Sequence, residues 1–189
     1  FKIKKSINNV RSNISKQKFI KIVNKAKKYI ASGDIFQVVL SQRFEKNLGK
    51  NPLDIYKKIR LTNPSPFLYY FNFSNFQIIG SSPEILVRIR DKKITIRPIA
   101  GTRKRGKNKI QDLRLAKSLL NDPKELSEHL MLLDLGRNDV GRAAEDGSVK
   151  VDEKFKIEKY SHVMHIVSNV FGKFKNNMSV LDGLLCGFP

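Results

Sequence analysis

The sequence predicts an α+β protein, built from layered antiparallel β-sheets with flanking helices. Between residues 67 and 100, runs of β-branched and aromatic residues are separated only by the short turn signals Ser74-Asn75 and Asp91-Lys92. Such short connections join antiparallel strands, because parallel strands need a long crossover. Helical segments occur in pairs between the strand-rich stretches, which favours this class over the alternative of a doubly wound parallel sheet.

The first predicted element is an amphipathic helix over residues 16–32. Its apolar residues recur at helical spacing, and Gly33 follows as a candidate C-cap. The next segment, FQVVLSQRF at 36–44, is rich in β-branched residues and predicts a buried strand. A short helix is then predicted at PLDIYKKIR, residues 52–60.

A pair of helices follows the strand-rich part of the chain. Residues 107–120 have helical spacing, and a second helix begins at Asp122-Pro123, where Asp suits the N-cap and Pro the first helical position. Glu125 then falls at the N3 position, as in a capping box. The expected buried side of this second helix is an apolar stripe made of Leu126, Leu130 and Leu133.

Strand-like stretches return beyond Gly136, at residues 148–160 and 162–174. The chain contains no repeat and no low-complexity linker, so we expect one domain over residues 1–189. Because the sequence begins at Phe1 and stops just after an apolar segment, we expect this domain to be incomplete at both ends.

The chain carries a formal net charge of +20. A charge of this size is typical of proteins that bind nucleic acids. The lysines, however, outnumber the arginines and are spread along the sequence rather than gathered in an aromatic-flanked patch, so we expect no nucleic-acid partner and keep that class as an alternative. The single cysteine, Cys186, and the lack of a long apolar run predict a cytoplasmic protein without a membrane segment.

Two carboxylates stand three residues apart at the start of the second helix. Glu125 and Glu128 lie on one side of it, flanking the apolar stripe. They could repel each other, face solvent, or hold a hard cation such as Mg²⁺, which takes oxygen ligands and is commonly bound by one or two carboxylates plus substrate oxygens. From spacing alone, a solvated helix face is favoured.

Six segments, taken in order, resemble the signature blocks of the chorismate-utilising enzymes, and most closely those of the anthranilate-forming branch. The resemblance extends over nearly the whole chain from residue 16 and corresponds to the middle of the family's protein. It implies a layered chorismate-binding fold, with the amino-terminal regulatory portion and the carboxy-terminal third absent. The segments are GDIFQVVLSQRF (33–44), NPSPFLYYF (63–71), IGSSPEILVR (79–88), IRPIAGTRKRG (96–106), DPKELSEHLMLLDLGRNDVGR (122–142) and YSHVMHIVSNVFG (160–172).

The resemblance implies Mg²⁺ as the cofactor. Glu128 resembles a direct ligand of that ion, and Glu125 a ligand that acts through water. The family's second pair of glutamates would belong to the absent carboxy-terminal third, so we expect this chain alone to be inactive.

The resemblance also implies catalytic roles. Glu84, in SSPE, resembles a general acid that protonates the departing ring hydroxyl, although an exposed glutamate opening a strand is the simpler interpretation of the pattern. Gly101 and Thr102, in PIAGT, resemble chorismate contacts, since glycine allows close backbone approach and threonine supplies a hydroxyl. His165, which by pattern alone would be a core histidine, resembles the imidazole that assists loss of pyruvate.

Two positions indicate which reaction of the family to expect. Gln37 stands where water-using members carry a lysine base, and a neutral amide cannot activate water, which favours ammonia. Ala100 stands where aminodeoxychorismate synthases commonly carry a nucleophilic lysine. His129 and His162 match no such role, and we interpret them as structural.

The expected reaction converts chorismate and ammonia to anthranilate and pyruvate, with ammonia supplied by a glutamine amidotransferase subunit in a hetero-oligomer. Asn63, Pro64, Ser65 and Pro66 resemble part of a tryptophan feedback site, although a proline-fixed loop entering a strand explains them equally well. Another chorismate enzyme, and a fragment that folds poorly, remain as alternatives.

Overall fold

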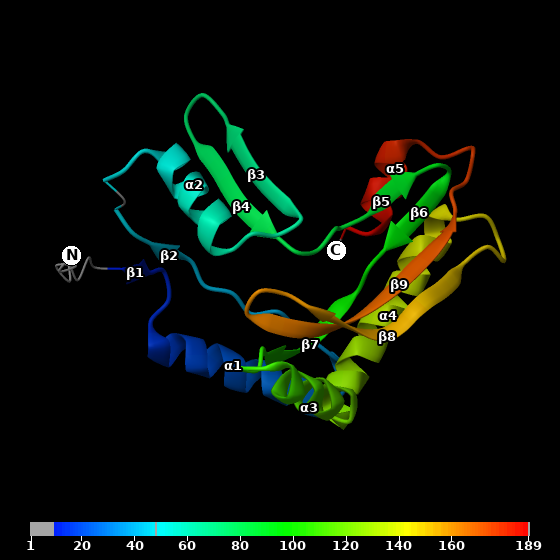
Figure 1. Ribbon diagram of the computed structural model, residues 1–189, viewed down its shortest axis with the longest axis horizontal. Coiled ribbons are helices and arrows are strands. Elements are labelled where there is room, and N and C mark those ends of the chain that lie inside the picture. Colours follow the sequence, from blue (N-terminus) through cyan, green and yellow to red (C-terminus); the bar gives the residue numbers. More distant parts are fainter. Residues whose placement is uncertain (1–9, 48, 189) are drawn as a thin grey trace. The chain divides into compact units, whose positions relative to one another are not determined.

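The computed structural model describes residues 10–47 and 49–188. These residues form two compact units, divided after Asn51, and Figure 1 shows their elements in order. No helix in the described ranges is long and apolar enough to cross a membrane.

The amino-terminal unit consists of one helix and two short strands. Helix α1 (Lys16–Ala31) follows the predicted range, and Ser15 caps it by accepting a hydrogen bond from the Lys18 amide at 3.3 Å. Strands β1 (Arg11–Ser12) and β2 (Phe44–Glu45) pair in antiparallel fashion.

The strand predicted over residues 36–44 is wrong. Most of that segment is irregular, and Phe36 and Val39 are 86% and 85% exposed. A strand needs a neighbouring ladder for its backbone groups. Within the described residues, β1 offers this segment only a two-residue partner, so β-branched composition alone does not produce a strand here.

The second unit begins with a helix and a hairpin. Helix α2 (Pro52–Thr62) confirms the predicted short helix, and strands β3 (Phe67–Asn72) and β4 (Gln77–Ser82) pair in antiparallel fashion around the predicted turn at Ser74-Asn75. Aromatic side chains line this hairpin, and the rings of Phe73 and Phe76 stack with centroids 4.8 Å apart across the turn.

A five-stranded antiparallel sheet follows, centred on β9 (Val163–Lys173). Strands β6 (Lys93–Ile96) and β7 (Ile99–Lys104) pair with successive parts of β9, while β8 (Lys150–Lys159) runs along its other side and β5 (Arg88–Arg90) lies outside β6. All pairings given by the structure are antiparallel, which confirms the predicted α+β class. Asp91 and Lys92, with φ of 50° and 56°, form the predicted tight turn of the β5–β6 hairpin.

Three helices complete the unit: α3 (Lys109–Leu120), α4 (Pro123–Ala143) and α5 (Val180–Cys186). Helices α3 and α4 cover one face of the sheet (Figure 1). Along β9, alternate residues are buried beneath them, as expected for a sheet with one covered face. The buried apolar residues form two clusters: Ile94, Leu133, Val140, Ala143, Ala144 and Val170 in one, and Leu119, Met164 and Ile166 in the other.

Helix α4 differs from its predicted form in two ways. It continues past Gly136 to Ala143, and Gly136 is buried against the sheet, where a Cβ would make ordinary contacts with Ile96 and Val170. The predicted buried stripe is also partly wrong: Leu130 is 49% exposed, whereas the neighbouring His129 is fully buried. Leu126 and Leu133 do pack toward the sheet, so His129 takes the place expected for Leu130 on that face.

Candidate active site

A bulge in β7 shapes the first part of the site. The β7–β9 register shifts between Ala100 and Thr102, and Gly101 lies there with φ of +71°. A side chain at Gly101 would be strained, since its Cβ would lie 3.1 Å from the Ile166 Cδ1 and 3.3 Å from the Leu119 Cδ1. The bulge therefore requires glycine and brings Thr102 opposite His165.

Thr102 and His165 are in contact. The His165 Nδ1 lies 3.0 Å from the Thr102 hydroxyl and 3.1 Å from the Gly101 carbonyl oxygen. Because a carbonyl can only accept a hydrogen bond, the Gly101 contact requires a proton on Nδ1, and Nε2 is the ring nitrogen left outside these two contacts. The His165 side chain is half-buried.

His165 lines a small pocket of about 200 Å³. Asn63, Pro64 and Ser65 line the same pocket, whereas Pro66 is not among its lining residues. This loop is fastened to β4 through Ser81, whose hydroxyl donates to the Asn63 carbonyl at 2.8 Å and lies 2.6 Å from the Ser65 hydroxyl. Three of the four residues predicted to bind tryptophan therefore line a pocket with the predicted catalytic histidine.

Tyr160 is a residue of this pocket that the sequence reasoning did not identify. Its ring meets the His165 ring edge-on, with centroids 5.5 Å apart, and its hydroxyl donates to Glu158 at 2.9 Å. Burial and the Glu158 carboxylate raise the pKa of Tyr160 to about 12, so the phenol keeps its proton. Its place in the YSHVMH segment, five residues before His165, is the only sequence signal that points to it.

Glu84 lines a larger pocket of about 380 Å³, together with apolar side chains of β6 and α4. Glu84 is exposed, but the surrounding protein atoms partly desolvate its carboxylate and raise its pKa; a hydrogen bond with the Ile99 backbone opposes this in part. Pro83 lines the smaller pocket, so the SSPE segment lies between the two. Asp139, which sequence reasoning did not single out, also lines the larger pocket, and burial raises its pKa.

The start of α4 is held by an arginine from β7. Asp122 is the N-cap, as predicted, and its carboxylate also accepts a hydrogen bond from the Arg103 Nη2 at 2.7 Å, which lowers the Asp122 pKa. The Glu125 carboxylate accepts from the Arg103 Nη1 at 3.3 Å, where the sequence suggested a capping box. Glu128 is half-buried and forms no ion pair or hydrogen bond with the described residues.

These carboxylates fit a magnesium ion only in part. Glu128 is available as an oxygen ligand, whereas Glu125 is engaged by Arg103. Within the described ranges, no group of three or more His, Cys, Asp and Glu side chains is arranged to hold a metal ion. The donor set therefore suits an ion that one carboxylate shares with further oxygens, such as those of an anionic substrate.

A second arginine fastens the same region. Arg105 donates to both carboxylate oxygens of Asp112, at 2.7 to 3.2 Å, and to the Tyr160 carbonyl at 2.7 Å. These bonds, with the Gly106 amide, lower the pKa of Asp112. The arginines of GTRKRG therefore link β7 to α3, α4 and the β8–β9 turn, which is a structural task.

The two positions that predict the reaction type are Ala100, in β7, and Gln37, in the other unit. Ala100 is 8% exposed and faces the core, so it presents no chemical group to either pocket. Gln37 belongs to the amino-terminal unit, on an exposed irregular segment. Its role stays a prediction.

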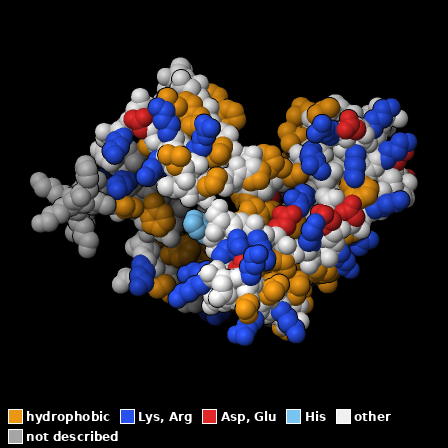
Figure 2. Space-filling model, viewed as in Figure 1, with side chains coloured by type: hydrophobic (Ala, Val, Ile, Leu, Met, Phe, Trp, Pro, Cys, Tyr) orange, Lys and Arg blue, Asp and Glu red, His pale blue; other side chains and the backbone are white. Residues whose placement is uncertain are grey.

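Basic side chains are scattered over the face shown in Figure 2, between hydrophobic ones, and form no single band there. Among the described residues, several pair with acids, including Arg97, Arg103 and Arg105. Lysine and arginine thus serve many separate local contacts in this chain.

Comparison with protein families identifies one match over nearly the whole chain. Residues 2–189 match the family described as chorismate binding enzyme. Two similar relatives, from Cereibacter sphaeroides and Aquifex aeolicus, bear the name anthranilate synthase component 1. Each is 56% identical, over 97% and 96% of this chain respectively, and the chain spans 37% of the length of each.

A solved structure agrees with these relatives. Anthranilate synthase component I from Streptococcus pneumoniae TIGR4 superposes with a TM-score of 0.87 at 41% identity. The match covers 95% of this chain and 39% of that structure's chain.

Proposed function

The chain belongs to the chorismate binding enzyme family, and from this we propose that it forms part of an enzyme that combines chorismate with ammonia and releases anthranilate and pyruvate. Because the chain spans 37% of the length of the relatives, the activity is proposed for a protein of their kind as a whole. One observation carries the proposal: Thr102 meets His165 beside a pocket, in a chain 56% identical to those relatives.

The proposed reaction assigns each of these residues a role. Ammonia adds to the ring while the ring hydroxyl leaves as water, and loss of pyruvate then gives the aromatic product. Glu84 would protonate the departing hydroxyl, and its raised pKa supports a proton being present there. His165, with Nε2 free to take or give a proton, would assist loss of pyruvate, while Gly101 and Thr102 would contact the substrate.

Ammonia is the proposed nucleophile because Gln37 and Ala100 carry no base or amine. We propose that a glutamine amidotransferase subunit supplies it, in keeping with the relatives' designation as component 1. A reducing, cytoplasmic setting suits the single cysteine. The same enzyme would respond to tryptophan through Asn63, Pro64, Ser65 and Pro66.

Mg²⁺ is the proposed cofactor, with Glu128 as its protein ligand and Glu125 acting through water once it is released from Arg103. When bound, the ion would supply positive charge to hold a substrate carboxylate. Replacement Glu128→Gln should raise the Mg²⁺ concentration needed for half-maximal activity by about tenfold or more, since an amide lacks the charge of a carboxylate. An unchanged Mg²⁺ requirement would remove Glu128 from the site.

The proposed activity can be tested in a grafted enzyme, made by exchanging this chain for the 181 residues that it matches in the Aquifex aeolicus relative. Chorismate, ammonium and Mg²⁺ should yield fluorescent anthranilate and an equal amount of pyruvate, which lactate dehydrogenase measures. The unmodified relative is the control for the assay. A folded grafted enzyme that consumes chorismate without forming anthranilate would contradict the proposal and favour another reaction of the family.

A further inference from the structure

A carboxylate lies directly across from the candidate catalytic histidine. In the antiparallel register, His165 faces Thr102 on β7 and Glu158 on β8, so the three side chains form one row on the face of the sheet opposite α3 and α4, called here the open face. Directly opposed residues of neighbouring strands have Cβ atoms about 4.5–5.5 Å apart. Glu158 is therefore close enough to His165 for its charge to act on whatever binds there.

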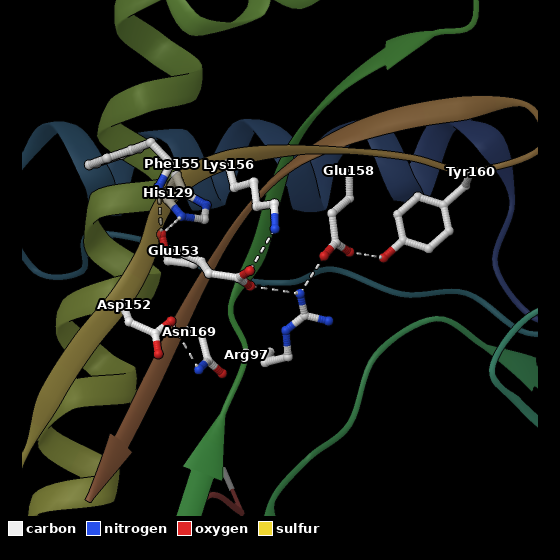
Figure 3. A network of polar contacts seen from close by, with 10 residues as sticks. Arg97, His129, Asp152, Glu153, Phe155, Lys156, Glu158, Tyr160 and Asn169 are labelled. Carbon is white, nitrogen blue, oxygen red and sulfur yellow. Dashed lines mark hydrogen bonds and ion pairs between the residues drawn. The ribbon is translucent and has the colours of Figure 1, made fainter.

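Arg97 compensates this carboxylate. It lies in the short link between β6 and β7, and its guanidinium donates to the Glu158 Oε1, while the Tyr160 hydroxyl donates to the Oε2 at 2.9 Å (Figure 3). The side chains of Arg97 and Glu158 are each 26% exposed, so water screens the pair only in part. Both carboxylate oxygens of Glu158 thus have donors.

An irregularity in β8 brings a second charge pair to the same place. The β8–β9 register shifts between Asp152 and Lys156, and Glu153 and Phe155 have φ of 48° and 56°, a region that side chains rarely adopt. This bulge carries Glu153 to within 3.9 Å of Arg97, and Lys156 pairs with Glu153 at 2.5 Å. Strained backbone of this kind persists where the surroundings fix it, often near functional sites.

The charges around the row are balanced. Arg97 and Lys156 offset Glu153 and Glu158, and Tyr160 keeps its proton. Other ionisable side chains near the row are Lys104, two residues beyond Thr102 on the same side of β7, and the carboxyl group of Glu84. Removing Arg97 alone would leave one uncompensated negative charge beside His165.

We propose that Arg97 is a positioning residue that neutralises Glu158, so that an anionic substrate can approach His165. This inference rests on the proposed function, because the carboxylates of chorismate are what an uncompensated Glu158 would repel. Arg97 would thus favour binding of the anionic substrate by neutralising Glu158, without contacting the substrate itself.

The test compares four variants in the grafted enzyme: Arg97→Gln, Arg97→Lys, Glu158→Gln and the double variant Arg97→Gln/Glu158→Gln. Arg97→Gln should raise the KM for chorismate about tenfold, equivalent to about 1.4 kcal/mol, with a smaller change in kcat. Arg97→Lys should restore most of the affinity, because it keeps the charge. The double variant should also regain affinity, because it removes the anion together with its partner.

A purely structural role gives a different pattern. The double variant would then bind chorismate no better than Arg97→Gln, and that result would overturn the inference, as would an unchanged KM in Arg97→Gln. Arg88→Gln, at an exposed arginine in β5, is the matched control and should leave KM unchanged. If Arg97→Gln fails to fold, Arg97→Lys and the double variant decide instead. The inference requires the KM of each to stay close to that of the unmodified graft, and a large rise in either overturns it. An inactive unmodified graft contradicts the proposed function instead.

Discussion

On each of its two faces, strand β9 contributes one residue to a histidine–hydroxyl pair, and the two pairs have different surroundings. On the covered face, the Ser168 hydroxyl lies 2.7 Å from the Nε2 of His129, both fully buried. On the other face, the Thr102 hydroxyl lies 3.0 Å from the Nδ1 of His165, which lines a pocket. The same two functional groups therefore meet twice, three residues apart along one strand.

The difference shows that environment, rather than residue type, decides what each pair can do. His129 is enclosed by α4 and the bulge of β8, where the Phe155 amide donates to Ser168 at 3.0 Å and the Phe155 ring packs against the imidazole (Figure 3). Desolvation lowers the pKa of His129, and its Nδ1 has no hydrogen-bond partner among the described residues. His165 lines a pocket, so of these two histidines it is the one that a ligand can reach.

The largest expected effect is on the open face. His165→Ala in the grafted enzyme should lower kcat/KM for anthranilate formation about 10²- to 10⁴-fold, because it removes the acid–base group. The melting temperature should change little, since His165 is only half-buried. Anthranilate fluorescence and thermal unfolding measure the two quantities. Activity within a few-fold of the unmodified graft would show that the reaction does not need His165, and that the two pairs do not differ in a catalytic role.

The next effect reverses the pattern on the covered face. His129→Ala in the 189-residue chain should lower the free energy of unfolding by about 3 kcal/mol, because it leaves a cavity and deprives Ser168 of a partner. Denaturant unfolding followed by circular dichroism gives this value. The same replacement in the grafted enzyme, assayed well below its unfolding temperature, should retain most of its kcat. A stable variant without activity would instead place His129 in the catalytic machinery.

Much of this contrast was predictable from the sequence, because local patterns carry it. Alternation along β9, turn signals and the N-cap at Asp122 predicted the sheet, the hairpins and the start of α4. The motif resemblance identified Gly101, Thr102 and His165, which the structure brings together. Their catalytic roles stay predictions.

What the sequence could not provide depends on contacts between distant segments. Arg97 and Glu158 are 61 residues apart, and no local pattern pairs them. The segment 36–44 is not a strand because strand formation requires a partner, and Glu125 meets Arg103 because β7 passes beside α4. The fully buried His129 was interpreted only as structural, and its partner Ser168 was not foreseen.

A glycine pair sharpens the comparison of the two faces through backbone geometry. Gly101→Ala should destabilise the chain by roughly 2 kcal/mol, because φ of +71° is unfavourable for alanine and the new Cβ would crowd Ile166. Gly141→Ala is the matched control: its Cβ meets nothing within 4 Å inside α4, so it should stabilise by about 0.5–1 kcal/mol. Denaturant unfolding measures both. Equal effects at the two glycines would contradict the conclusion that the β7 bulge requires glycine at position 101.

The smallest expected effect concerns Tyr160, whose ring contacts the His165 ring. Tyr160→Phe keeps the ring contact and removes one hydrogen bond to Glu158, so the free energy of unfolding should fall by about 1 kcal/mol at neutral pH. Tyr29→Phe, at an exposed tyrosine of α1, should leave it unchanged.

The pH dependence provides the sign of the Tyr160 contribution. The folded state holds the phenol proton more tightly than the unfolded chain, because the pKa of Tyr160 rises from 10.0 to about 12. Its contribution is therefore fully present below pH 10 and is lost as the pH rises through 12. Between these values the unmodified chain should lose stability more steeply than Tyr160→Phe. Parallel curves of unfolding free energy against pH, from urea unfolding, would show that Glu158 does not hold the phenol proton of Tyr160 in the folded chain.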